Sequence, residues 1–92
     1  MPNVVDLSLC TEARRSLRRV LDERGLGFFV RPGPSPGRAP RIDARRIAWV
    51  VEAARRSRRV RSADADSLAR TRRVLRRELI RLLADTLLRA GA

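Results

Sequence analysis

The sequence predicts a mainly all-α protein, a three-helix arrangement in a single small domain (residues 1–92) with a long C-terminal helix and one short extended segment at residues 28–30. Three observations lead to this fold class. Apolar residues recur at helical spacing in three separate stretches. Glycine, proline and aspartate stand at the boundaries of these stretches, as they do at helix ends. The run Phe28-Phe29-Val30 is the only aromatic and β-branched cluster, and it is too short to build a sheet alone.

The first helix is expected to begin near Ser8 and to stop at Gly25, which fits a glycine C-terminal cap. Its buried face holds apolar residues at spacings of four, four, three and one: Leu9, Ala13, Leu17, Val20 and Leu21. Cys10 lies at the edge of this face and is expected to be a small buried residue. It is the single cysteine of a sequence without histidine, so we expect neither an internal disulfide nor a structural metal.

The stretch after the first helix is predicted to be irregular. Residues 28–30 are expected to lie extended against the helices and to cover the core. Residues 31–40 read RPGPSPGRAP, and four prolines and two glycines in ten residues forbid a helix. We therefore expect a Pro/Gly-rich loop or connector at 31–40, inside the single domain.

The second helix has the clearest start in the sequence. Asp43 is expected to be its N-cap and Ala44 its first residue, with Ile42 and Ile47 closing a hydrophobic staple across the cap. The expected buried face consists of Ile47, Val50, Val51 and Ala54. The apolar pattern fades into the arginine-rich residues 55–61, where the helix should fray or end.

The third helix is expected to start after Ser62 or Asp64 and to run to about Arg89, roughly 40 Å of helix. Its main apolar seam consists of Leu68, Leu75, Leu79, Leu82 and Leu83. Arg72 and Arg76 interrupt the edges of this seam, which disfavours a regular coiled coil. Near the C-terminus three more apolar residues widen the seam: Ile80, Leu87 and Leu88.

So small a chain buries only about 60 to 65% of its unfolded surface, which makes a three-helix monomer marginal. We therefore expect an oligomeric helical bundle, formed as a homodimer or with a heteromeric helical partner. The predicted interface consists of Leu75, Leu79, Ile80, Leu82, Leu83, Leu87 and Leu88.

The chain is strongly basic, because 22 arginines stand against 10 acids and give a net charge of +12. Five of the arginines lie within residues 55–61, with no acid among them. Helix C-terminal carbonyl groups account for two or three of these arginines. The others repel one another unless an anion comes close, so this cluster is either a polyanion contact or a solvated basic turn.

A second basic feature follows the third helix. Arginines recur at spacings of three, four and four and form one stripe opposite the leucine seam: Arg70, Arg73, Arg77 and Arg81. The stripe spans about 16 Å, comparable to two or three phosphate spacings on a nucleic-acid strand. The alternative is an ordinary solvated face, although Glu78 and Asp85 lie beside the stripe and not within it.

Trp49 falls outside the buried face of the second helix, between Arg45 and Arg56 on the helical wheel. Two uses fit an exposed tryptophan in that position. It can stack on a nucleobase, or it can cover a second hydrophobic surface at an interface.

These features predict a small basic helical protein that grips the phosphate backbone of RNA or DNA without strong sequence specificity. The predicted nucleic-acid-binding residues are Arg45, Arg55, Arg56, Arg58, Arg59, Arg61, Arg70, Arg73, Arg77, Arg81 and Trp49. The alternative is an oligomerising adaptor or assembly subunit that docks an acidic protein partner through its arginine face.

Other function classes are disfavoured. Without histidine, lysine or tyrosine most general acid–base chemistry is missing, so we expect no enzyme, no cofactor and no metal. The third helix lacks the aromatic anchors of membrane-surface helices, so no membrane partner is expected. No secretory signal pattern opens the sequence, and we expect a cytoplasmic location, either free or associated with a nucleoid or ribosome.

Overall fold

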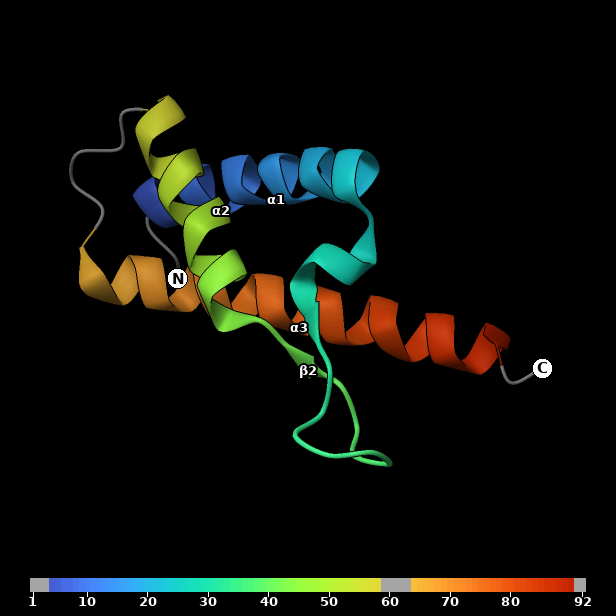
Figure 1. The fold of residues 1–92 in the computed structure, drawn as a ribbon. Helices are drawn as coiled ribbons and strands as arrows, with labels where there is room; N and C mark the ends of the chain where they lie inside the picture. The colour runs from blue at the N-terminus through green and yellow to red at the C-terminus, as the bar shows by residue number, and fades with distance from the viewer. Residues whose placement is uncertain (1–3, 59–63, 91–92) are drawn as a thin grey trace.

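Three α-helices and one short pair of strands make up the part of the chain that the computed structural model describes, residues 4–58 and 64–90 without the side chains of 4–6, 57 and 58. In chain order the elements are α1 (Val4–Arg24), the 3₁₀ helix η1 (Leu26–Phe29), β1 (Val30–Arg31), β2 (Arg41–Ile42), α2 (Ala44–Arg58) and α3 (Ala65–Ala90) (Figure 1). The predicted all-α class with three helices is confirmed.

Helix α1 begins at Val4, so the predicted start near Ser8 is wrong. Leu7, the described side chain of this additional turn, is exposed. Leu7 lies outside the buried apolar face that begins at Leu9, so the apolar period in the sequence indicated a later start. At its other end α1 stops at Arg24 as predicted, and Gly25 adopts φ 80° and ψ 170°, a conformation essentially restricted to glycine.

The segment at residues 28–30 differs from the prediction in conformation. Phe28 and Phe29 belong to η1, and only Val30 is extended. The backbone N–H of Phe28 donates to the carbonyl oxygen of Gly25 (3.3 Å), which closes the tight turn that Gly25 starts. Phe29 is fully buried, so the segment does cover the core.

A two-stranded antiparallel sheet, which the sequence did not predict, pairs β1 with β2 and places Val30 opposite Ile42. The pairing partners are separated by residues 32–40, which form the loop between the strands. The backbone of this loop folds back closely on itself at Gly33. A Cβ atom at that position would lie 2.6 Å from the carbonyl oxygen of Arg38. Glycine is therefore required at that position.

Helix α2 starts at Ala44 behind the N-cap Asp43, as predicted. The Oδ1 atom of Asp43 accepts hydrogen bonds from the backbone N–H groups of Arg45 (3.0 Å) and Arg46 (3.4 Å). Two donors that a helix leaves unpaired at its start are satisfied in this way. The whole predicted face is buried: Ile47, Val50, Val51 and Ala54.

Helix α3 starts after Asp64, one of the two predicted caps. The Oδ1 atom of Asp64 accepts a hydrogen bond from the backbone N–H of Ser67 (2.8 Å), and Ser62 lies outside the described residues. This hydrogen bond favours the carboxylate and lowers the pKa of Asp64. The helix contains 26 residues, which at 1.5 Å per residue is about 39 Å, so it sets the longest extent of the molecule, 43 Å.

The core lies where the three helices meet. Its buried apolar residues are Leu9, Ala13, Leu17, Phe29, Ile47, Val50, Val51, Ala54, Leu75 and Leu79. The predicted intermolecular role of Leu75 and Leu79 is therefore wrong, because both are 0% exposed and pack against helices of their own chain. Apolar spacing identifies a face that needs burial, but it does not say whether the covering surface comes from the same chain.

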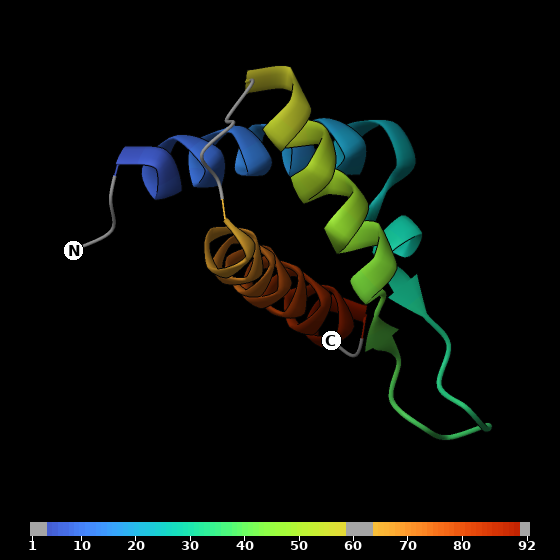
Figure 2. The ribbon, with the colours of Figure 1, turned by 90° about the vertical axis from the view of Figure 1, so that its left-hand side faces the viewer.

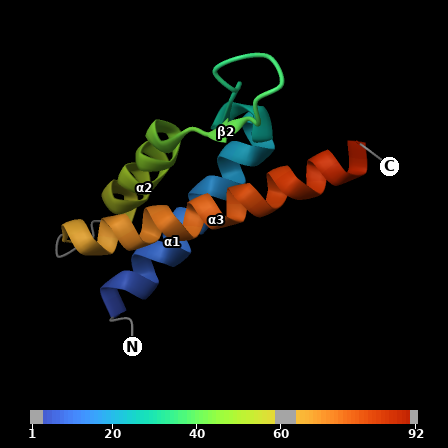
Figure 3. The same cartoon turned by 90° about the horizontal axis from the view of Figure 1, so that it is seen from below.

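Helix α3 crosses α1, and its C-terminal part projects beyond the other helices (Figures 1 and 3). A view close to the axis of α3 shows α1 and α2 on the same side of it (Figure 2). Toward the projecting end the other predicted interface residues are exposed or half-buried: Ile80, Leu82, Leu83, Leu87 and Leu88.

Candidate functional site

The predicted arginine stripe lies on the solvent side of α3. All four members are exposed: Arg70, Arg73, Arg77 and Arg81. Leu75 and Leu79 hold the opposite side of the helix in the core, so the stripe faces away from the body of the chain. At its first position Nη2 of Arg70 donates a hydrogen bond to Oγ of Ser67 (3.3 Å).

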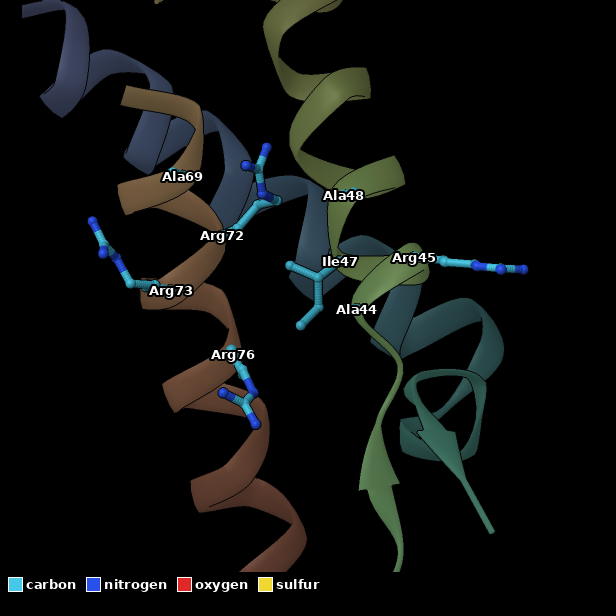
Figure 4. A pocket seen from close by; sticks show the side chains of 8 residues that line it. All are labelled: Ala44, Arg45, Ile47, Ala48, Ala69, Arg72, Arg73 and Arg76. Carbon is cyan, nitrogen blue, oxygen red and sulfur yellow. The ribbon is translucent and has the colours of Figure 1, made fainter. Parts of the chain in front are cut away.

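A groove of about 490 Å³ lies between the N-terminal halves of α2 and α3 (Figure 4). Its apolar lining comes from both helices: Ala44, Ile47, Ala48 and Ala69. Four arginines complete the lining: Arg45, Arg72, Arg73 and Arg76. Figure 4 shows Arg72 projecting into the space between the helices and Arg76 lying along α3, whereas Arg45 and Arg73 point outward on opposite sides.

The sequence had singled out Arg45 and Arg73 but not the two arginines between the helices. In the sequence pattern, Arg72 and Arg76 interrupt the edges of the leucine seam. Their role as groove-lining residues depends on the packing of α2 against α3, and no local pattern encodes that packing. The presence of alanine at Ala48 and Ala69, where the two helices leave a hollow, was the one signal available in the sequence.

Several acids of the described chain are engaged away from this surface. Glu78 lies beside the stripe on α3, but its Oε1 atom is 2.7 Å from Nε of Arg14 on α1. Asp43 and Asp64 accept backbone hydrogen bonds at the starts of α2 and α3. Among the described side chains, which exclude that of Asp6, no carboxylate forms an ion pair with the groove arginines or with the last two arginines of the stripe.

The arginine cluster at residues 55–61 is balanced in part by Glu52, one helical turn earlier. Glu52 forms an ion pair with Arg55, and its Oε1 atom lies 3.9 Å from Nε of Arg56. The hydrogen bond from Arg55 lowers the pKa of Glu52. The first two arginines of the cluster therefore have a counter-charge in Glu52, which lies outside residues 55–61. The side chain of Arg58, and the whole of Arg59 and Arg61, lie outside the described part of the chain.

Trp49 is 55% exposed, outside the buried face of α2 as predicted. Its ring centroid lies 6.0 Å from that of Phe28, and the guanidinium carbon of Arg46 lies 3.9 Å from the Phe28 centroid. Part of the indole therefore covers a second hydrophobic surface of the same chain, and the rest is open. Of the predicted binding residues, Arg45 and Arg73 line the groove described above, whereas Trp49 does not.

Comparison with known proteins gave no match: no family model, no curated protein and no solved structure matches this chain. None of the described helices combines the length and the apolar character that crossing a bilayer requires. In the described residues no three side chains among histidine, cysteine, aspartate and glutamate gather as metal ligands do.

Proposed function

We propose that the chain binds nucleic acid through the phosphate backbone, with the arginine stripe of α3 as the principal contact. The observation that carries this proposal is a row of exposed guanidinium groups that have no ion-paired carboxylate within the described residues: Arg73, Arg77 and Arg81. Guanidinium groups bind phosphate oxygens through bidentate hydrogen bonds. A polyphosphate also relieves the mutual repulsion of several such groups at once.

The dimensions of the stripe suit a strand of phosphates. Arg70 and Arg81 are separated by about 16 Å along the helix axis, two or three phosphate spacings. Each neutralised phosphate releases condensed counterions, so affinity falls steeply as salt rises. Contacts to phosphates carry little sequence information, and the proposal therefore includes weak sequence specificity.

Helix α1 offers an internal comparison, because it is also rich in arginine. It carries five arginines with four acids, whereas α3 carries seven arginines with three acids. Residues 69–77 of α3 contain five arginines and no acid. A polyanion is therefore expected to prefer α3, and arginines on α1 provide charge-matched controls.

The test compares two triple variants in anisotropy titrations with labelled duplex DNA, duplex RNA and single strands. The first replaces Arg73, Arg77 and Arg81 by glutamine, which preserves helix propensity. The control makes the same change in the exposed α1 arginines Arg15, Arg18 and Arg19. The far-ultraviolet circular dichroism of both variants verifies the fold.

We expect the α3 variant to lose at least about tenfold in affinity and the α1 control to lose much less, because only the α3 arginines contact phosphate. Equal losses in the two variants contradict the proposal, since they mean that net charge alone decides binding. Absence of binding by the unmodified chain at about 50 mM salt also contradicts it.

The proposal also includes assembly. Because Leu75 and Leu79 are buried, the proposed interface consists of the apolar residues at the projecting end of α3. The exposed or half-buried apolar residues there are Ile80, Leu82, Leu83, Leu87 and Leu88. Leu88 is 74% exposed. Apolar side chains concentrated at one end of a helix support contact with a second copy or with a partner helix.

A further inference from the structure

The groove between α2 and α3 differs chemically from the stripe. Its lining is apolar, because Ala44 and Ala48 of α2 face Ala69 of α3 with the buried Ile47 beside them. Small side chains on both helices leave the hollow of about 490 Å³, which lies in the size range of binding clefts. Covering an apolar hollow removes apolar surface from water, which is energetically favourable.

The edges of this hollow are cationic. Arg72 and Arg76 lie one helical turn apart on α3 and both line the groove, with Arg72 projecting toward α2 (Figure 4). No acid lines the groove, and neither arginine has an ion-paired carboxylate within the described residues. The groove therefore offers an apolar surface together with two guanidinium groups that form no ion pair with a described carboxylate.

We propose that this groove binds an acidic amphipathic helix of a partner protein. The apolar side chains of that helix cover the alanines and Ile47, and carboxylates one turn apart pair with Arg72 and Arg76. The alanine floor allows the close approach of a third helix, since helices pack at 8–10 Å between their axes. Helix-in-groove recognition of this kind uses anchors at spacings of three and four residues.

Other occupants match only half of the groove. The sugar–phosphate backbone of a nucleic acid pairs with the arginines but leaves the apolar floor uncovered. A fatty acid covers the floor but supplies a single carboxylate for two guanidinium groups. A second copy of this chain is disfavoured by charge, because arginines outnumber acids in each of the described α-helices.

The inference is independent of the nucleic-acid proposal. Arg73 lines the outer edge of the groove but its side chain points outward, as part of the stripe, and the stripe residues Arg77 and Arg81 do not line the groove (Figure 4). The two surfaces can therefore be changed separately. Filling the hollow removes room for a helix and leaves every arginine in place.

The experiment uses a fluorescently labelled helical peptide of about 18 residues, long enough to form a helix. Its leucines recur at spacings of three and four, and glutamates flank them; a matched peptide carries glutamine in place of each glutamate. The groove variants are Ala69→Leu and, separately, Ala48→Leu, each of which extends a side chain into the hollow. A third variant joins Arg72→Gln with Arg76→Gln, and Arg18→Gln with Arg19→Gln is its charge-matched control.

We expect micromolar binding of the glutamate peptide and at least about tenfold weaker binding of the glutamine peptide. Both alanine variants and the double groove variant should weaken the glutamate peptide at least about tenfold, while the α1 control stays within about twofold of the unmodified chain. Ala69→Leu should leave the affinity for duplex DNA unchanged.

Unchanged peptide affinity in both alanine variants overturns the proposal, because the hollow then plays no part in binding. Equal binding of the glutamate and glutamine peptides overturns the charge argument. If the unmodified chain binds oleate but not the peptide, and Ala69→Leu abolishes oleate binding, the groove is a site for a small amphiphile and the proposal is overturned. If one alanine variant loses its helical circular dichroism signal, the peptide affinity of the other alanine variant provides the test.

Discussion

The Nε atom of Arg14 on α1 lies 2.7 Å from Oε1 of Glu78 on α3. This ion pair joins two helices far apart in the sequence, and it turns toward α1 an acid that lies beside the arginine stripe. The side chains of both partners keep more than a third of their surface exposed. Its importance is therefore electrostatic more than structural, because it separates a carboxylate from the proposed binding surface.

Breaking this ion pair should cost little stability. We expect Glu78→Gln to change the free energy of unfolding by less than about 1 kcal/mol, as is usual for exposed pairs. Urea unfolding of the single variants and of the double variant with Arg14→Gln measures the coupling. A coupling energy well above about 1 kcal/mol would show that the pair is a major structural contact.

Leu79 is expected to stabilise the single chain, because it is buried in the core. Leu79→Ala should lower the free energy of unfolding by about 2 to 5 kcal/mol through lost burial and the cavity left behind. Leu88→Ala, at a position that is 74% exposed, should lower it by less than about 0.5 kcal/mol. Equal effects on urea unfolding at several protein concentrations would contradict this division of α3 into a buried and an exposed part.

The exposed end of α3 is expected to mediate assembly. Replacing Leu87 and Leu88 together by glutamate should reduce an oligomer to a single chain, since charged groups are costly to bury in an apolar contact. Sedimentation or light scattering measures the mass, with Arg18→Gln and Arg19→Gln as a control away from this end. A mass of one chain for the unmodified protein, at every concentration tested, argues against self-assembly.

Acid should destabilise the start of α3 in a defined direction. The N–H of Ser67 holds the pKa of Asp64 below its ordinary value, so the stabilisation is present at neutral pH and is lost as the pH falls through the lowered pKa. Asp64→Asn keeps a capping oxygen but does not titrate. We expect the variant to lose less stability than the unmodified chain between about pH 4 and pH 2, measured by circular dichroism during thermal unfolding. Parallel pH profiles would contradict this role.

Local signals in the sequence predicted much of the helical framework. Asp43 caps α2 and Asp64 caps α3, because a capping side chain needs only the backbone N–H groups two or three residues later. The buried face of α2 followed from apolar spacing for the same reason. Such features depend on neighbours in the chain, and the sequence displays them directly.

Features that depend on distant residues were not predictable in this way. The pairing of Val30 with Ile42 spans a proline-rich loop. Leu79 has the apolar spacing of an interface residue, and only the packing of the helices decides that its own chain covers it. The groove position of Arg72 and Arg76 likewise arises from the crossing of α2 and α3.

The salt dependence of nucleic-acid binding tests the central proposal most directly. For duplex DNA the plot of log affinity against log salt concentration should have a slope of about −4 or steeper, because four or more phosphates are neutralised. Replacing Arg73, Arg77 and Arg81 by glutamine should make that slope shallower by about 3, whereas the triple α1 control should leave it nearly unchanged. A slope that is the same in the unmodified chain and in both triple variants would contradict the assignment of α3 as the phosphate-binding surface.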